Sequence, residues 1–139
     1  MFKEILLASD GSAHAIRAAK TAVQLAGEQK LGKITVLYAV DGAVSKSDIL
    51  SEGDPKARER RRKERLKETE DVLQQNQVDY QVRIIKGDPG PSIVKFANDN
   101  HYDVVVIGSR GLNGLQEMVL GSVSHKVAKR AACPVMIVK

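Results

Sequence analysis

Glycine and serine residues suited to phosphate binding follow one apolar segment of this sequence. Residues 104–107 read VVVI, and glycines stand directly behind them at positions 108, 111, 114 and 121. Glycine permits positive φ angles and lets a ligand approach the backbone closely. Gly121 and Ser122 then open a helical pattern, and the unpaired amides at a helix N-terminus bind phosphate. The segment therefore has parts for two regions of a nucleotide, a close-approach turn and an anion cradle.

Two features qualify this interpretation. The hydroxyls of Ser122 and Ser124 would add donors at the helix start, as expected for a phosphate site. Neither G-x-x-x-x-G-K-[ST] nor G-x-G-x-x-G occurs in the sequence, so the phosphate motifs of the common nucleotide folds do not apply. Spacing alone leaves a second explanation open, in which the glycines only turn the chain.

Asp10 is the second candidate functional residue. It follows the apolar run 5–8 within the turn cluster SDGS. Its carboxylate could contact a ligand, or it could cap the helix that begins near Ser12 or close the turn. In a parallel sheet, ligands bind beyond the carboxyl ends of the strands where the strand order reverses. The most apolar strands, 5–8 and 104–107, should flank that point, so Asp10 and the glycine segment should meet.

The elements that position these residues alternate along the chain. Strands are predicted at 5–8, 34–40, 80–85, 104–107 and 135–138, with helical patterns between them, including a charged helix over 55–77. Such alternation predicts an α/β fold with a parallel sheet covered by helices on both faces. The 139 residues suit a single domain, 1–139.

Composition excludes several classes of protein. With 42% hydrophobic and 28% charged residues, the chain reads as an ordinary globular protein. No apolar run approaches the roughly 20 residues of a membrane span, and the start lacks a signal-peptide pattern, so we expect a cytoplasmic protein with no membrane partner. Cys133 is the only cysteine, which excludes an intramolecular disulfide and a cysteine zinc site.

The net charge of +5 is concentrated in one stretch. Residues 56–71 hold eight basic and five acidic side chains. This stretch is either a solvated helix face or a basic surface for an anionic partner. Aromatic residues make up only 4% of the chain, which argues against single-stranded nucleic acid as that partner.

A family resemblance narrows these alternatives. The run GSRG, nine further residues and then GS fit the pattern Gly-x2-Gly-x9-Gly-(Ser/Thr). With ILLASDGSAHAIRAAKTAVQLA, ITVLYAVD, GDPGPSIVKFANDNHYDVVVIGSRG and CPVMIVK, the chain resembles the ATP-binding branch of the universal stress protein family over nearly its whole length. The resemblance implies an open five-stranded sheet of order 3-2-1-4-5, Rossmann-like and adenine nucleotide alpha hydrolase-like. It also implies a homodimer.

The resemblance also implies a ligand and its site. The ligand would be ATP, with Mg²⁺ or Mn²⁺ carried on its phosphates and no dedicated metal ligands. The implied contacts at the nucleotide from the turn after strand 1 are Ala8, Ser9 and Asp10, and those at the adenine from the end of strand 2 are Ala39 and Val40. The glycine turn would hold ribose and phosphate through the backbone of Gly108, Ser109 and Gly111 and the side chain of Arg110. The start of the last helix would hold the phosphates through Gly121, Ser122, Val123 and Ser124. Many ATP-binding relatives have Pro-Thr at positions 8 and 9, which leaves the hydroxyl contact of Ser9 open.

The expected function is a dimeric, nucleotide-dependent regulatory module with an unknown protein partner. Hydrolysis of ATP should be slow at most, because no Ser-His-Asp set, paired carboxylates or base for water is readable. The alternative is a nucleotide-independent stress adaptor with the same fold. The dimer should form through the strand Val135–Val138, because an uncovered apolar edge is an aggregation hazard unless it pairs.

Overall fold

The computed structural model of the protein describes residues 2–28, 31–40, 55–110 and 121–139. Gly111, one of the predicted site residues, lies outside these ranges. The elements alternate as predicted: β1 (Glu4–Ala8), α1 (Ala13–Ala26), β2 (Lys33–Val40), α3 (Pro55–Gln75), β3 (Tyr80–Lys86), α4 (Pro89–Asn100), β4 (Val104–Gly108), α5 (Ser122–Arg130) and β5 (Val135–Val138). No helix within the described ranges is long and apolar enough to cross a membrane.

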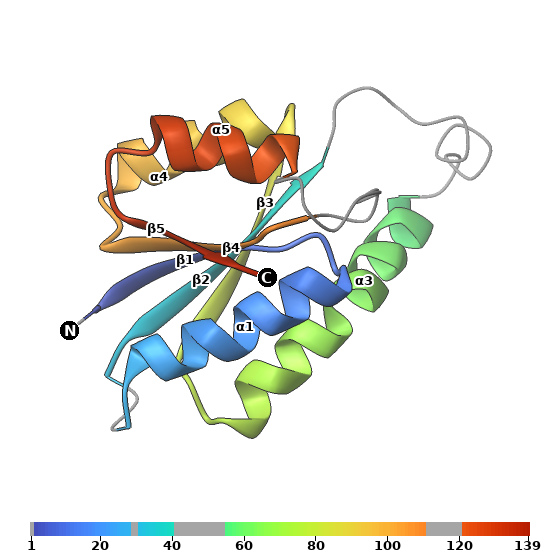
Figure 1. Cartoon of the computed structure of the whole chain (residues 1–139). Coiled ribbons are helices and arrows are strands. Elements are labelled where there is room, and N and C mark those ends of the chain that lie inside the picture. The colour runs from blue at the N-terminus through green and yellow to red at the C-terminus, as the bar shows by residue number, and fades with distance from the viewer. Residues whose placement is uncertain (1, 29–30, 41–54, 111–120) are drawn as a thin grey trace.

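The five strands form one parallel sheet, as the sequence predicted, and their order β3-β2-β1-β4-β5 is the one that the family resemblance implied. β1 lies between β2 and β4, and Leu6 is paired with Thr35 on one side and Val105 on the other. β2 and β3 lie on one side of β1, and β4 and β5 lie on the other. The strand order therefore reverses between β1 and β4. The carboxyl ends of all strands meet at one edge of the sheet (Figure 1).

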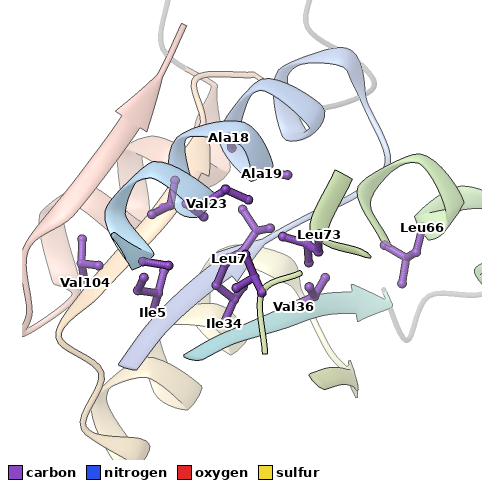
Figure 2. Packing of buried hydrophobic residues seen from close by; sticks show 14 of the residues in the cluster. Ile5, Leu7, Ala18, Ala19, Val23, Ile34, Val36, Leu66, Leu73 and Val104 are labelled. Atoms are coloured by element: carbon purple, nitrogen blue, oxygen red, sulfur yellow. The ribbon is translucent and has the colours of Figure 1, made fainter. Parts of the chain in front are cut away.

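Helices cover both faces of the sheet. α1 and α3 lie on one face and α4 and α5 on the other (Figure 1). Side chains alternate along a strand, so Ile5 and Leu7 pack beneath α1 and α3 (Figure 2), whereas Leu6 packs toward α4 and α5. β4 is buried along its whole length, which confirms its predicted interior position. The residues at its end, and at the end of β1, are therefore held by rigid neighbours.

Candidate functional site

The turn after β1 is organised by the carboxylate of Asp10. The Ser12 N–H donates to Asp10 Oδ1 at 2.9 Å, and the Ser12 hydroxyl in turn accepts from the Ala15 N–H at 3.2 Å. Ser12 is the N-cap of α1, as predicted. Asp10 therefore closes the turn, and this structural role coexists with its predicted role as a ligand contact.

Ser9 and Gly11 connect the same turn to α3. The buried Ser9 Oγ lies 3.3 Å from Thr69 Oγ1 and accepts from the Gly11 N–H at 3.4 Å. Gly11 has a φ of 80°, and a Cβ atom there would lie 2.5 Å from the carbonyl oxygen of Arg65. The turn therefore needs glycine at this position, both for its conformation and for the close approach of α3.

The residues after β4 start beside the turn of β1, because Ala8 is paired with Ile107. The Ser109 N–H donates to the Val138 carbonyl at 2.7 Å, and the Ser109 carbonyl accepts from the Gly121 N–H at 2.8 Å. Both backbone groups of Ser109 are therefore already bonded within the protein, and their contact with a ligand stays a prediction. Arg110 follows, partly buried.

α5 begins at the same edge, without a side-chain cap. Its N-cap is Gly121, with no side-chain capping bond and no acidic residue in the first turn. The first amides of a helix have no intrahelical acceptor, so those of Ser122, Val123 and Ser124 are the predicted donors to an anion. The Ser124 hydroxyl does not contribute as expected, because it is buried and donates to the carbonyls of Ser109 at 2.9 Å and Gly121 at 3.1 Å.

Two glycines of the motif are explained by packing within the protein. A Cβ atom on Gly108 would lie 2.8 Å from the Cβ of His14 and 2.9 Å from its backbone carbon. One on Gly121 would lie 3.1 Å from the Ser109 carbonyl oxygen. These contacts are shorter than side chains normally make, so part of the glycine spacing lets α1, β4 and α5 approach one another.

His14 joins the site although the sequence analysis did not assign it. Its Nδ1 lies 3.0 Å from Arg17 Nη2 and 3.3 Å from Ser109 Oγ. A guanidinium can only donate, so Nδ1 accepts and the ring is neutral with its proton on Nε2. Desolvation lowers the pKa of His14, and the charges of Arg17 and Arg110 lower it further. Its position one turn after Asp10, on the helix that follows the turn, was the available signal.

Two further predicted site residues, Ala39 and Val40, come from β2, the strand beside β1. Ala39 and Val40 lie partly buried at the end of β2, where the Val40 carbonyl accepts from the Gly87 N–H at 2.8 Å. Within the described part of the chain, no group of three or more His, Cys, Asp or Glu side chains could hold a metal ion. The arrangement suits binding of an anionic ligand through backbone amides and arginines.

Comparisons with known proteins identify the family. The universal stress protein family model matches residues 1–139. The universal stress protein YxiE of Bacillus subtilis is 34% identical over 149 aligned positions, which cover all of both chains. The structure of MJ0577, from Methanocaldococcus jannaschii, superposes with a TM-score of 0.79 at 27% identity, covering 100% of this chain and 96% of that one. A universal stress protein in complex with cAMP superposes with a TM-score of 0.72 at 25% identity, covering 99% and 97%. The chain therefore belongs to the universal stress protein family.

Proposed function

We propose that this protein binds an adenine nucleotide, ATP in particular, at the carboxyl edge of the sheet between β1 and β4. A bound nucleotide would change a surface that a protein partner contacts, and the protein would act in this way as a regulatory module. The observation that carries the proposal is the start of α5, where three amides face an edge that also holds Asp10 and Arg110. Ligands of open parallel sheets bind at such a reversal of strand order.

The residues present fit the phosphates of a nucleotide. A helix N-terminus carries a partial positive charge, and the first turn of α5 has no acidic side chain to oppose an anion. Arg110 adds a full positive charge nearby. Mg²⁺ or Mn²⁺ would be carried on the phosphates themselves. The relative determined in complex with cAMP supports an adenine nucleotide as the ligand class.

Hydrolysis of the bound nucleotide is expected to be slow. Amides fixed around a phosphate give some electrostatic stabilisation of a transition state. The Nδ1 atom of His14 is already engaged with Arg17 and so is not a readily available base for water. We therefore expect turnover far below the ~1–10³ s⁻¹ of dedicated enzymes. A rate within that range that is lost in Asp10→Ala would contradict this part of the proposal.

A nucleotide-independent adaptor is the second candidate. The packing of Gly108 against His14 favours it, because it explains a motif glycine without any ligand. The same applies to Gly121 against Ser109. For this reason a bulky replacement of either glycine would not separate the two functions, since it would also disturb the fold.

Substitution of the exposed Ser122 separates them. Ser122→Glu places a negative charge where the phosphates are expected, and Ser122→Gln is a control of equal size without charge. A negative charge at a helix N-terminus stabilises the helix, so the Glu variant should fold as well as wild type. Calorimetric titration should show ATP affinity reduced at least about tenfold by Glu, the effect of ~1.4 kcal/mol, and little changed by Gln.

Mass analysis of nucleotide released from the purified, denatured protein is the companion measurement. Co-purified nucleotide, or ATP binding that only Ser122→Glu weakens, supports the binding module. No released nucleotide and no heat on titration of the wild-type protein would leave the adaptor as the function.

A further inference from the structure

The charges on α3 are separated along the helix. Residues 56–67 contain eight basic and two acidic side chains, whereas residues 68–75 contain three acidic and no basic ones. This order opposes the helix dipole, which favours acidic residues at the N-terminal end and basic residues at the C-terminal end. The first turn of α3 has no acidic residue and its last turn has no basic one. Helix stability therefore does not explain the basic half of α3, which is residues 56–67.

The basic half of α3 extends past the carboxyl edge of the sheet. Thr69 is level with Ser9, the first residue after β1, and the Arg65 carbonyl lies against Gly11 in the following turn. Each earlier residue lies about 1.5 Å further along the helix axis. Arg61 therefore stands roughly one turn, or ~6 Å, beyond the level of Arg65. In Figure 1 the start of α3 lies at the end of the sheet where the strands terminate.

Two arginines of this half lie toward the inward side of the helix. The buried residues Leu66, Thr69 and Leu73 define the face that packs on the protein. Arg62 precedes Leu66 by four residues and so continues this face. Arg61 and Arg62 are partly buried, and Arg61 Nη2 is fully buried, whereas Arg60 and Lys63 are exposed. The basic segment of α3 therefore has an inward side with Arg61 and Arg62 and an exposed side with Arg60 and Lys63.

Arg65 fixes the position of this segment. Its Nη1 donates to the hydroxyl of the buried Tyr38 on β2 at 2.6 Å. Its carbonyl meets Gly11, as described above, and Thr69 meets Ser9 one turn later. α3 is thus held against the same turn that carries Asp10. These contacts fix the position of α3 along its axis, so the helical turn that carries Arg61 and Arg62 lies beyond the level of Arg65.

We propose that Arg61 and Arg62 form a cationic wall that binds the terminal phosphates of a polyphosphate ligand at the candidate site. The wall rests on the proposed function and adds ligand specificity to it. Arginine binds phosphate through a planar fork of donors, often with two parallel hydrogen bonds. The amides of α5 can serve the phosphate of a monophosphate. The wall adds contacts only for a ligand with a longer phosphate chain, so the protein prefers a triphosphate to a monophosphate.

Two double variants, each of which removes two positive charges from α3, test whether Arg61 and Arg62 bind phosphate. Arg61→Gln with Arg62→Gln removes two positive charges from the inward side, and Arg60→Gln with Lys63→Gln removes two from the exposed side. Calorimetry with ATP, AMP and inorganic tripolyphosphate should show ATP and tripolyphosphate affinity reduced about tenfold or more by the inward pair. This follows because charge-assisted hydrogen bonds to the phosphates are lost, and a factor of ten in affinity corresponds to ~1.4 kcal/mol. AMP affinity should change less than about twofold, and the exposed pair should have little effect on any probe.

The thermal midpoint without ligand checks the fold of each variant. Should the inward glutamine pair fail to fold, Arg61→Lys with Arg62→Lys replaces it. That pair keeps both charges and loses the planar fork, so ATP affinity should still fall several-fold.

The outcomes separate this inference from the proposed function. Equal losses in the inward and exposed pairs, or no loss in the inward pair, overturn the wall while nucleotide binding stands. Tripolyphosphate binding that only the inward pair weakens, with no binding of ATP or AMP, supports the wall as an anion site and overturns the proposed nucleotide function. A wild-type protein that binds none of the three probes overturns both.

Discussion

Gly108 and His14 are packed so closely that a Cβ atom on Gly108 would lie 2.8 Å from the Cβ of His14. Residue 108 ends a buried strand, and residue 14 lies in the first turn of α1. Neither backbone can move without disturbing the sheet or the helix. Gly108→Ala should therefore lower the free energy of unfolding by about 1–3 kcal/mol, the usual effect of overpacking, as urea denaturation would measure.

The double variant Gly108→Ala with His14→Ala identifies the cause. The added methyl group would also lie 2.9 Å from the carbonyl carbon of residue 14 and 3.0 Å from its oxygen. Alanine at position 14 keeps the Cβ atom, and these backbone contacts also remain, so stability should not be restored. A Gly108→Ala protein as stable as wild type would show that the two segments separate easily.

The C-terminal end of α3 contains a residue poorly suited to its conformation. Gln77 has a φ of 56°, the left-handed region, within a Schellman motif in which the Val78 N–H donates to the Leu73 carbonyl at 3.2 Å. Glycine is the usual residue there because it has no Cβ. Gln77→Gly should raise the free energy of unfolding by about 0.5–1 kcal/mol in urea denaturation. The control Gln75→Gly, at the last residue of α3, should lower it by less than about 1 kcal/mol. A loss of stability in Gln77→Gly would contradict the interpretation that the left-handed conformation is unfavourable for Gln77.

Asp103 predicts a pH dependence of stability. Its carboxylate accepts hydrogen bonds from the Glu4 and Lys3 amides, both at 2.9 Å, and these bonds hold the pKa of Asp103 below its ordinary 3.8. A carboxyl group with a lowered pKa stabilises the fold fully above its unfolded pKa, and this contribution is lost as pH falls through the folded pKa. Asp103→Asn should therefore be less stable than wild type at pH 7, and the gap should narrow below about pH 4.

Urea denaturation at pH 7 and pH 3 measures this gap. Asp79→Asn, at an exposed position, controls for the loss of one negative charge. A stability difference between wild type and Asp103→Asn that is constant across this range would show that the carboxylate charge contributes nothing to the two hydrogen bonds.

Local patterns were sufficient to predict the architecture, and the reasons are visible in particular residues. The apolar run 104–107 predicted a buried strand, and Ser12 predicted the start of α1, because burial and capping depend on near neighbours in sequence. The family resemblance supplied the strand order, which periodicity alone does not give. Helix and strand ends differed slightly, as in α3, which ends at Gln75 instead of residue 77.

The roles of site residues were less predictable because they depend on contacts between distant segments. Ser124 was expected to donate to a phosphate, but its hydroxyl donates to Ser109, fifteen residues earlier. His14 approaches Ser109 from 95 residues away. No local pattern encodes either distance. The residues assigned to nucleotide binding remain predictions, and Gly111 lies outside the described residues.

The edge strand β5 predicts self-association. Met136 is 38% exposed and belongs to neither core cluster, while the strand's inner side is paired with β4. An apolar edge of this kind is protected in a dimer, and two-fold symmetry would place two copies of the strand against each other. Light scattering at micromolar concentration should therefore show a dimer of the 15.2 kDa chain. Met136→Lys should shift it to monomer, because a charged edge side chain blocks pairing and would face its own copy. Ala128→Lys adds the same charge at an exposed position of α5 and should leave the dimer intact. A wild-type protein that scatters only as a monomer would show that this edge is protected in another way.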